Sequence, residues 1–486
     1  MPIDLNNTDP IDQNDLQFDA LLSNLQGNIL KGHGRNHTAN IFVEFDAAKL
    51  PEVRDWIHGF AEKRVTSAKR QLKENECFKR NGVSGGLFVG LYVTAKGYEY
   101  FKVAPANRPN DPSFNGGMEN AALHDPPIGE WETTFKKLNI HVMLLLGDDD
   151  KTALSVAAAE VINTLRLLTT DDDFVSDSIR TEYGNAIRNA NGDGLEHFGY
   201  VDGISQPLFF KDEYERFKAS ATPSTGGTLA WDPLAPLKQV LVKDPLVATE
   251  DACGSYFVFR KLEQEVRGFK VAERALAKEL QLEGEARELA GALVVGRFED
   301  GTPVTLAPVD GLIGSGAANN FNYDKDADGL RCPFQAHIRK SNPRRTAGGQ
   351  PLAGEKAHIM ARRGIPFGQR EVTPAIESQP EQFPSGGGVG LLFQSFQADL
   401  REQFEFIQKT WVNDAMFPNL IPARHTGIDP IIGQSPRPAD PKDRSYEWPA
   451  EYGKPGAPVP KSFDAFVTMK GGQYFFAPSI DGLNAL

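Results

Sequence analysis

Cysteine and long apolar runs are scarce in this chain of 486 residues. The three cysteines, Cys77, Cys253 and Cys332, lie far apart and form no CxxC pair, which argues against a disulfide framework and against a cysteine zinc site. Any metal must therefore be held by other ligands or by a cofactor. No apolar stretch approaches the roughly 18 residues of a membrane-spanning helix. The strongest run, Val142 to Leu146, has the length of a strand.

Excess positive charge is also absent, since the formal net charge is −13. Nucleic acids and anionic membrane surfaces select basic patches, so we expect neither as a partner. The segment 1–15 is polar and acidic and lacks the charged-then-apolar pattern of a secretory signal. A soluble cytoplasmic protein is therefore the expectation.

The first half of the chain alternates between strand and helix patterns. From the spacing of apolar residues we expect strands at 40–45, 86–94 and 138–146. Helices are expected at 51–68, after the first strand, and at 151–168, after the third. A further strand is expected near 174–177. This βαββαβ order is that of a ferredoxin-like unit.

The second half also alternates between strand and helix patterns, without repeating the sequence of the first. We expect strands at 254–260, 388–394 and 474–478, and helices at 263–282 and 398–409. The chain is therefore predicted to be α+β, with two ferredoxin-like domains over 1–225 and 226–486. Each domain would consist of an antiparallel sheet with helices on one side. The segment 429–462 is dense in proline and charge and is expected to be a surface excursion.

Several short motifs have ordinary explanations. The GxSxG pattern at 82–86 lacks the strand before it and the helix after it that a hydrolase elbow needs. Asp324, Asp326 and Asp328 reproduce half of a calcium loop, but such carboxylates can also be solvated or cap a helix. The glycines at 314–316 lack the third glycine and the flanking βαβ of a dinucleotide site.

Three other segments carry more information. They are EHFGYVDGISQP at 196–207, RCPFQAHIRKSNPR at 331–344 and RRGIPFG at 362–368. Taken singly, they would be a turn, a buried histidine and a solvated arginine pair.

In this order, the three segments resemble the motifs of the dye-decolorizing peroxidase family. GxxDG falls at 199–203, the proximal histidine segment at 332–344 and the distal arginine segment at 362–368. Further matches are LQGNILK at 25–31, GLLF at 390–393 and GGQYFFAPS at 471–479, so the likeness spans nearly the whole chain. The length is most similar to that of the larger subgroup with fungal and bacterial members.

The resemblance implies one haem b per chain, wedged between the two ferredoxin-like domains. It also implies that hydrogen peroxide is reduced to water through an oxoferryl intermediate. The electrons would come from bulky aromatic donors such as dyes and phenols. Hydrogen peroxide and these donors are therefore the expected partners, and the chain is expected to be a monomer or a homodimer.

The resemblance assigns the central roles to four residues. His337 would be the axial ligand of the iron, and its second ring nitrogen would donate to a carboxylate, for which Asp429 is our choice and Asp414 the alternative. Asp202 would move a proton between the peroxide oxygens, which it can do only while ionised. Arg362 would stabilise the negative charge on the departing oxygen.

Four further residues are expected to contact the haem. Arg344 would pair with a propionate, since bidentate recognition favours arginine. Gly203 would allow the backbone to approach a flat ligand closely. Leu391 and Phe393 would wall the distal pocket and restrict it to peroxide-sized molecules.

Bulky donors are expected to react at the surface, with electrons passing inward through redox-active aromatic residues. The candidates are the tyrosines and Trp56, Trp131, Trp231, Trp411 and Trp448, each of which can equally be an ordinary packing residue. Phe367 stands where some relatives carry a tyrosine, so a relay at that position is not available here.

Two other functions are kept open. The first is a protein that binds or handles haem, releases its iron and has only incidental peroxidase activity. The second is a ferredoxin-like interaction module without a cofactor. The pair Asp202 and Arg362 favours an enzyme, because a carrier has no use for both groups.

Overall fold

The computed structural model describes residues 3–137, 139–170, 178–221, 228–312, 318–346, 350–370, 379–383, 385–418, 425–436 and 439–486. Its main feature is one antiparallel sheet with the strand order β10-β11-β8-β14-β2-β3-β1-β4, to which β7 and β9 add at β8 and β11. No helix among these residues has both the length and the apolar character needed to cross a membrane.

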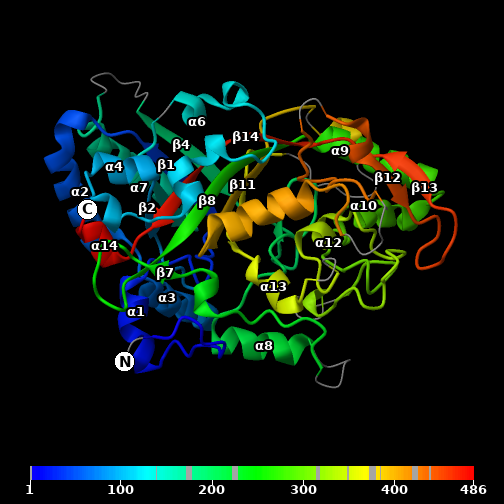
Figure 1. The fold of residues 1–486 in the computed structure, drawn as a ribbon, viewed down its shortest axis with the longest axis horizontal. Helices are drawn as coiled ribbons and strands as arrows, with labels where there is room; N and C mark the ends of the chain where they lie inside the picture. Colours follow the sequence, from blue (N-terminus) through cyan, green and yellow to red (C-terminus); the bar gives the residue numbers. More distant parts are fainter. Residues whose placement is uncertain are drawn as a thin grey trace.

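The strands of the first half stand together at one end of the sheet (Figure 1). They are β1 (His37–Val43), β2 (Phe88–Val93), β3 (Val142–Asp148) and β4 (Ile179–Asn185). The helices α2 (Leu50–Arg64), α3 (Ala68–Asn81), α4 (Ala95–Tyr100) and α7 (Lys151–Arg166) connect them. All positions of β2 and β3 are buried, in agreement with sequences that are apolar except for Asp148 at the end of β3. The order β2-β3-β1-β4 is that of a ferredoxin-like unit.

The second half builds an equivalent group of strands. They are β7 (Val242–Lys243), β8 (Cys253–Gln264), β9 (Ala361–Arg362), β10 (Ile365–Phe367), β11 (Gly390–Gln397) and β14 (Val467–Ala477). The helices α9 (Val266–Glu279) and α10 (Glu288–Val295) follow β8. The order β10-β11-β8-β14 repeats the ferredoxin-like arrangement, so the predicted fold class is confirmed.

The two groups join edge to edge, where Phe476 of β14 pairs with Val93 of β2. The predicted boundary between 225 and 226 falls in the segment 222–227, outside the described residues. The division into two domains at that point therefore remains a prediction.

Shorter elements complete the chain. The helices are α1 (Asp19–Asn24), α5 (Pro112–Gly116), α6 (Thr133–Lys137), α8 (Lys211–Ala221), α12 (His337–Ser341), α13 (Leu352–Ala357) and α14 (Ile480–Asn484). The strands are β5 (Ile187–Arg188), β6 (Gly194–Leu195), β12 (Ser445–Trp448) and β13 (Val459–Ser462). Two π-helical segments are η9 (Leu400–Glu405) and η10 (Ile407–Val412).

Some predicted element boundaries were wrong. The helix expected at 51–68 ends at Arg64, and α3 begins after it, with the Ser67 hydroxyl accepting from the Arg70 N–H as a cap. The helix expected at 398–409 is π-helical rather than α-helical. The strand expected near 174–177 falls on residues outside the described part, and β4 begins just after them, at Ile179.

The segment 429–462 is more than a surface excursion. Its hairpin of β12 and β13 does lie at the periphery (Figure 1). The segment nevertheless buries Asp429, Tyr446 and Trp448 almost completely. The high content of proline and charged residues correctly predicted the loops of this segment, but it gave no indication of these three buried residues.

The acidic residues 324–328 do not form a calcium loop. The Asp326 carboxylate accepts hydrogen bonds from the backbone N–H groups of Arg331 and Cys332, and it forms a buried ion pair with Arg339 at 3.0 Å. Among the described residues, no group of three or more acidic, histidine or cysteine side chains could hold a metal ion. Asp326 is therefore structural.

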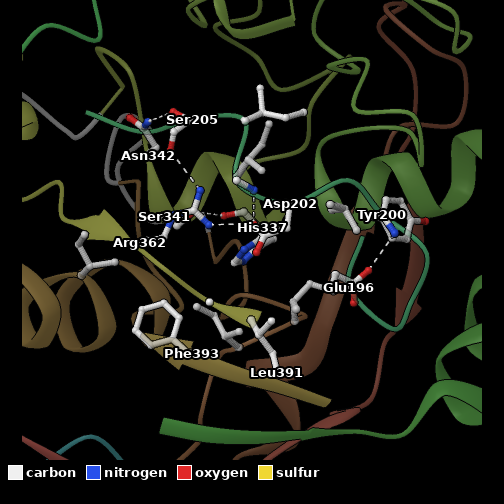
Figure 2. Close-up of a pocket in the computed structure, with 18 of the residues that line it drawn as sticks. Glu196, Tyr200, Asp202, Ser205, His337, Ser341, Asn342, Arg362, Leu391 and Phe393 are labelled. Carbon is white, nitrogen blue, oxygen red and sulfur yellow. Dashed lines mark hydrogen bonds and ion pairs between the residues drawn. The ribbon is translucent and has the colours of Figure 1, made fainter. Parts of the chain in front are cut away.

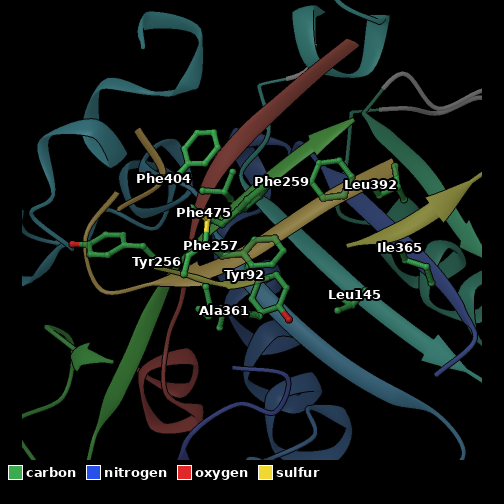
Figure 3. Packing of buried hydrophobic residues seen from close by; sticks show 14 of the residues in the cluster. Tyr92, Leu145, Tyr256, Phe257, Phe259, Ala361, Ile365, Leu392, Phe404 and Phe475 are labelled. Carbon is green, nitrogen blue, oxygen red and sulfur yellow. The ribbon is translucent and has the colours of Figure 1, made fainter. Parts of the chain in front are cut away.

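Aromatic packing joins the two halves of the sheet. Phe257 of β8 is fully buried, with its ring centroid 4.6 Å from that of Tyr92 of β2 and 4.8 Å from that of Phe396 of β11 (Figure 3). Such pairs stabilise a core beyond the apolar area they bury.

We predict that Phe257→Ala lowers the free energy of unfolding by about 3–5 kcal/mol, because a large cavity opens where the halves meet. Urea denaturation followed by circular dichroism measures this change. Phe78→Ala is the control, since Phe78 is 54% exposed on α3 and its truncation should change stability little. Equal effects of the two substitutions would contradict this account of the core.

Candidate active site

A cavity lies beside the second group of strands and brings together most of the residues that the sequence singled out (Figure 2). All predicted site residues but one line it, namely Asp202, Gly203, His337, Arg344, Arg362, Leu391 and Phe393. The exception is Asp429, which lies behind His337. These side chains come from the loop after β6, from α12 and the loop after it, and from β9 and β11.

His337 is the first residue of α12, and its imidazole is oriented by Asp429. The two atoms His337 Nδ1 and Asp429 Oδ2 are 2.7 Å apart. Asp429 is completely buried, whereas the His337 side chain is 25% exposed toward the cavity. Burial alone would lower the pKa of His337, but the Asp429 carboxylate outweighs it and raises the pKa above its usual value. With Nδ1 committed to Asp429, Nε2 is the nitrogen left to act in the cavity.

Asp429 is itself fixed by its own chain. Its second oxygen, Oδ1, accepts hydrogen bonds from the N–H groups of Ile431 and Ile432, at 2.7 and 3.0 Å. Burial disfavours the charged form, but His337 and these donors keep the pKa of Asp429 below its usual value. The alternative, Asp414, does not contact His337: its side chain accepts from the Met416 N–H.

Asp202 and Arg362 form an ion pair on the cavity wall. Arg362 Nη1 donates to Asp202 Oδ1 at 3.0 Å, and the Gly203 N–H donates to the same oxygen at 2.6 Å. No hydrogen bond from the described residues reaches Asp202 Oδ2. Arg362 is further oriented by Ser205 and Gln206, which accept from its Nη2 and from its backbone N–H.

The loop that carries Asp202 is held by a partly buried glutamate. Glu196 accepts hydrogen bonds from the N–H groups of Phe198 and Tyr200, and Gln264 of β8 donates to it. Burial raises the pKa of Glu196 above its usual value. Gly203 has a φ of +82°, a conformation that favours glycine, and a Cβ at this position would meet no atom within 4 Å. The backbone here is therefore open to the cavity.

Two arginines in the cavity wall are buried without a carboxylate. Arg344 donates to the carbonyl oxygens of Asn319 and Phe321, and Arg297 to those of Gly301 and Ala318. Neither forms an ion pair with any described residue. Burial lowers the pKa of Arg344 to about 9 and that of Arg297 to about 10. Buried cations of this kind call for an anion.

The two neighbouring arginines at 362–363 have different roles. Whereas Arg362 faces the cavity, Arg363 donates to the carbonyl oxygens of Asn28, Ile29 and Arg362. Arg363 thus ties the LQGNILK segment to β9 and is structural.

Apolar side chains complete the cavity. Leu391 and Phe393 alternate with buried residues along β11 and so point to the cavity together (Figure 2). Leu262, Val295, Ile338 and Phe404 also line it. The wall is therefore mainly apolar, with its charges at a few positions.

Sequence reasoning missed three contributors. Arg297 lies in a segment without a recognisable motif. One of its hydrogen bonds is to the carbonyl oxygen of Ala318, which is 21 residues away in the chain. Gln264 reaches Glu196 only through the fold. Glu196 could have been found from the sequence, because it is the first residue of the segment 196–207 that also contains Asp202.

The tryptophans contribute to packing. Trp131, Trp231, Trp411 and Trp448 are buried, and Trp56 stacks on Phe60 with ring centroids 4.6 Å apart. None of the five is among the described residues that line the cavity.

No family model matches the chain. The chain is 42% identical over 492 residues to the multifunctional dye peroxidase DyP2 of an Amycolatopsis species, with 100% of both chains covered. The dye-decolorizing peroxidase AauDyP1 of Auricularia auricula-judae is 31% identical, over 76% of this chain and 70% of the relative.

Solved structures agree with these sequence matches. The structure of DyP2 from Amycolatopsis superposes with a TM-score of 0.88 at 39% identity, covering 100% of both chains. The DyP-type peroxidase of an Anabaena species gives a TM-score of 0.87 at 39% identity, over 99% of this chain and 98% of the other. The chain therefore belongs to the dye-decolorizing peroxidase family, whose members are haem-dependent oxidoreductases that use peroxide.

Proposed function

We propose that this chain binds one haem b in the cavity through His337, reduces hydrogen peroxide to water there, and oxidises bulky aromatic donors such as dyes and phenols. The observation that carries the proposal is that the His337–Asp429 pair and the Asp202–Arg362 pair meet at one cavity. The name of the Amycolatopsis relative supports the choice of donor, as does a solved relative in complex with 2,6-dimethoxyphenol, at 26% identity and a TM-score of 0.73.

The residues of the cavity fit a haem. A porphyrin needs an apolar enclosure, an axial ligand and cations for its two propionates. The wall offers Leu391 and Phe393, the imidazole of His337, and the buried arginines Arg297 and Arg344 without a carboxylate partner. When bound, the haem iron supplies the oxidising equivalents that pass from peroxide to the donor.

His337 would hold the iron through Nε2. The hydrogen bond to Asp429 places the proton on Nδ1 and leaves the lone pair of Nε2 for the metal. A carboxylate behind an imidazole also makes the ligand more basic. Both Asp429 oxygens are already engaged, so the orientation of the ring does not depend on solvent.

Asp202 and Arg362 would act on the peroxide. Oδ2 of Asp202 takes a proton from one peroxide oxygen and gives it to the other, which leaves as water. The Arg362 guanidinium stabilises the negative charge that develops on the departing oxygen. Ser205 and Gln206 hold this guanidinium in place before the reaction, so little reorganisation is needed.

The finer expectations remain predictions. They are the cytoplasmic location and a monomeric or homodimeric state. The alternative of an iron-releasing, haem-handling protein gives no role to the Asp202–Arg362 pair. A comparison of peroxide turnover with iron release from added haem separates the two functions.

We predict that His337→Ala abolishes stoichiometric haem binding, because the axial ligand is lost. Titration of the purified protein with hemin, followed at the Soret band, measures this binding. His58→Ala on α2 is the matched control, since His58 is exposed and away from the cavity. Retention of a full complement of haem by His337→Ala would remove His337 as the ligand.

We predict that Arg362→Leu slows the reaction of the haem-loaded protein with peroxide by about 10²–10³-fold, the usual loss when one preorganised donor is removed. Stopped-flow spectroscopy gives the rate constant. Arg401→Leu, at an exposed position, should leave it unchanged. A rate constant for Arg362→Leu equal to that of the wild type would refute the role of Arg362.

We predict that Asp202→Asn slows the same reaction severely, because an amide can accept a hydrogen bond but cannot carry the proton. The same stopped-flow traces, recorded with the haem content matched, provide the test. Traces near those of the wild type would assign peroxide cleavage to Arg362 alone.

A further inference from the structure

Asp429 lies on a tight turn formed by residues 429–433, which we call the Asp429 turn. The Gly433 N–H donates to the backbone carbonyl oxygen of Asp429 at 3.0 Å, and two other N–H groups of the turn donate to the carboxylate. A Cβ at Gly433 would lie 2.4 Å from the carbonyl oxygen of Asp429, so no side chain fits there. The backbone of the turn therefore sets the place of the carboxylate, and a shift of the turn would move Oδ2 away from His337.

Two side chains from other segments bind carbonyl oxygens of the Asp429 turn. Gln408 Nε2 of η10 donates to the carbonyl oxygen of Ile432 at 3.1 Å. Arg444, at the end of the 3-10 helix η11 (Pro441–Arg444), donates to those of Pro430 and Gly433, at 3.4 and 2.5 Å. Three of the five carbonyl oxygens of the turn are thus held by side chains 11 or more positions away in the chain.

The π-helical form of η10 orients Gln408 for this contact. The Asn413 N–H donates to the carbonyl oxygen of Gln408 at 2.9 Å, which is the five-residue spacing of a π-helix. In an α-helix, side chains five positions apart would be rotated by about 140° from one another. Here Gln408 Nε2 also donates to Asn413 Oδ1 at 2.9 Å, and the same oxygen accepts from the Gln434 N–H at 2.8 Å. The buried Gln408 amide is therefore held in one orientation where it meets the turn.

We propose that Gln408 and Arg444 are positioning residues that act on His337 through the Asp429 turn. By holding the turn, they keep Asp429 Oδ2 at 2.7 Å from His337 Nδ1. A carboxylate at this distance makes the imidazole a more basic ligand, and a more basic ligand stabilises ferric iron relative to ferrous iron. The inference rests on the proposed function, in which His337 holds the haem iron.

The different charges of the two side chains separate positioning from a simple electrostatic effect. If both act through the turn, removal of either weakens the hydrogen bond between His337 and Asp429 and raises the ferric–ferrous midpoint potential. If Arg444 acted only through its positive charge, its removal would favour the more positive ferric form and lower the potential. Gln408 is neutral, so its removal changes no charge.

The experiment uses haem-loaded full-length protein with Gln408→Met and Arg444→Met. The matched controls are Gln403→Met and Arg267→Met, because each of these side chains also donates to two backbone carbonyl oxygens, away from the turn and the cavity. Three quantities are measured. They are the iron–histidine stretching frequency of the ferrous protein by resonance Raman spectroscopy, the ferric–ferrous midpoint potential, and the free energy of unfolding in urea.

Gln408→Met and Arg444→Met are both expected to move the iron–histidine band to lower frequency. Both should also shift the ferric–ferrous equilibrium toward the ferrous form by about threefold or more, which is ~28 mV for one electron. The two controls should keep the band and the potential of the wild type, even where the free energy of unfolding falls. This comparison separates an effect on His337 from a general loss of stability.

Gln408 also lines the cavity, so a direct effect on the haem needs its own test. In protein that already carries Asp429→Asn, Gln408→Met should cause no further shift of band or potential, because the group through which it acts is gone. An equal shift in both backgrounds would overturn the inference for Gln408, and a band at the wild-type frequency in Arg444→Met would overturn it for Arg444. Failure of the proposed function is distinct, because wild-type protein would then bind no haem or show no iron–histidine band.

Discussion

The hydrogen bond between His337 Nδ1 and Asp429 Oδ2 is the contact on which the rest of the site depends. It fixes the proton on one ring nitrogen and presents the other to the cavity. The two residues are 92 positions apart, and a buried carboxylate at Asp429 is tolerable only because backbone N–H groups and the imidazole satisfy it. The backbone turn at 429–432 therefore holds the carboxylate that orients the imidazole of His337.

The remaining charges follow the same rule that a buried ion needs a partner. The buried Arg339 pairs with Asp326, and the partly exposed Asp202 and Arg362 pair with one another. Arg297 and Arg344 have no ion pair among the described residues, and they line the cavity in which we propose that haem binds. Asp202 comes from the first half of the chain and Arg362 from the second, so the ion pair joins the halves at the site as Phe257 and Tyr92 join them in the core.

Much of this arrangement could be predicted from the sequence. Strand and helix periodicity predicted two α+β halves, and the short motifs pointed to Asp202, His337 and Arg362, because each motif is local in the chain. Helix α3 was merged with α2, since apolar spacing runs across the Ser67 cap. Arg297 and Gln264 could not be found in this way. Their positions depend on contacts between distant segments. Asp429 was preferred to Asp414 from the sequence, and the structure brings Asp429 against His337.

The most direct test of the central contact is the resonance Raman spectrum of the ferrous, haem-loaded protein. Wild-type protein should show an iron–histidine stretching band, and Asp429→Asn should shift this band to lower frequency because the imidazole loses its negative partner. A spectrum without such a band, or a band that does not move in Asp429→Asn, would contradict the account.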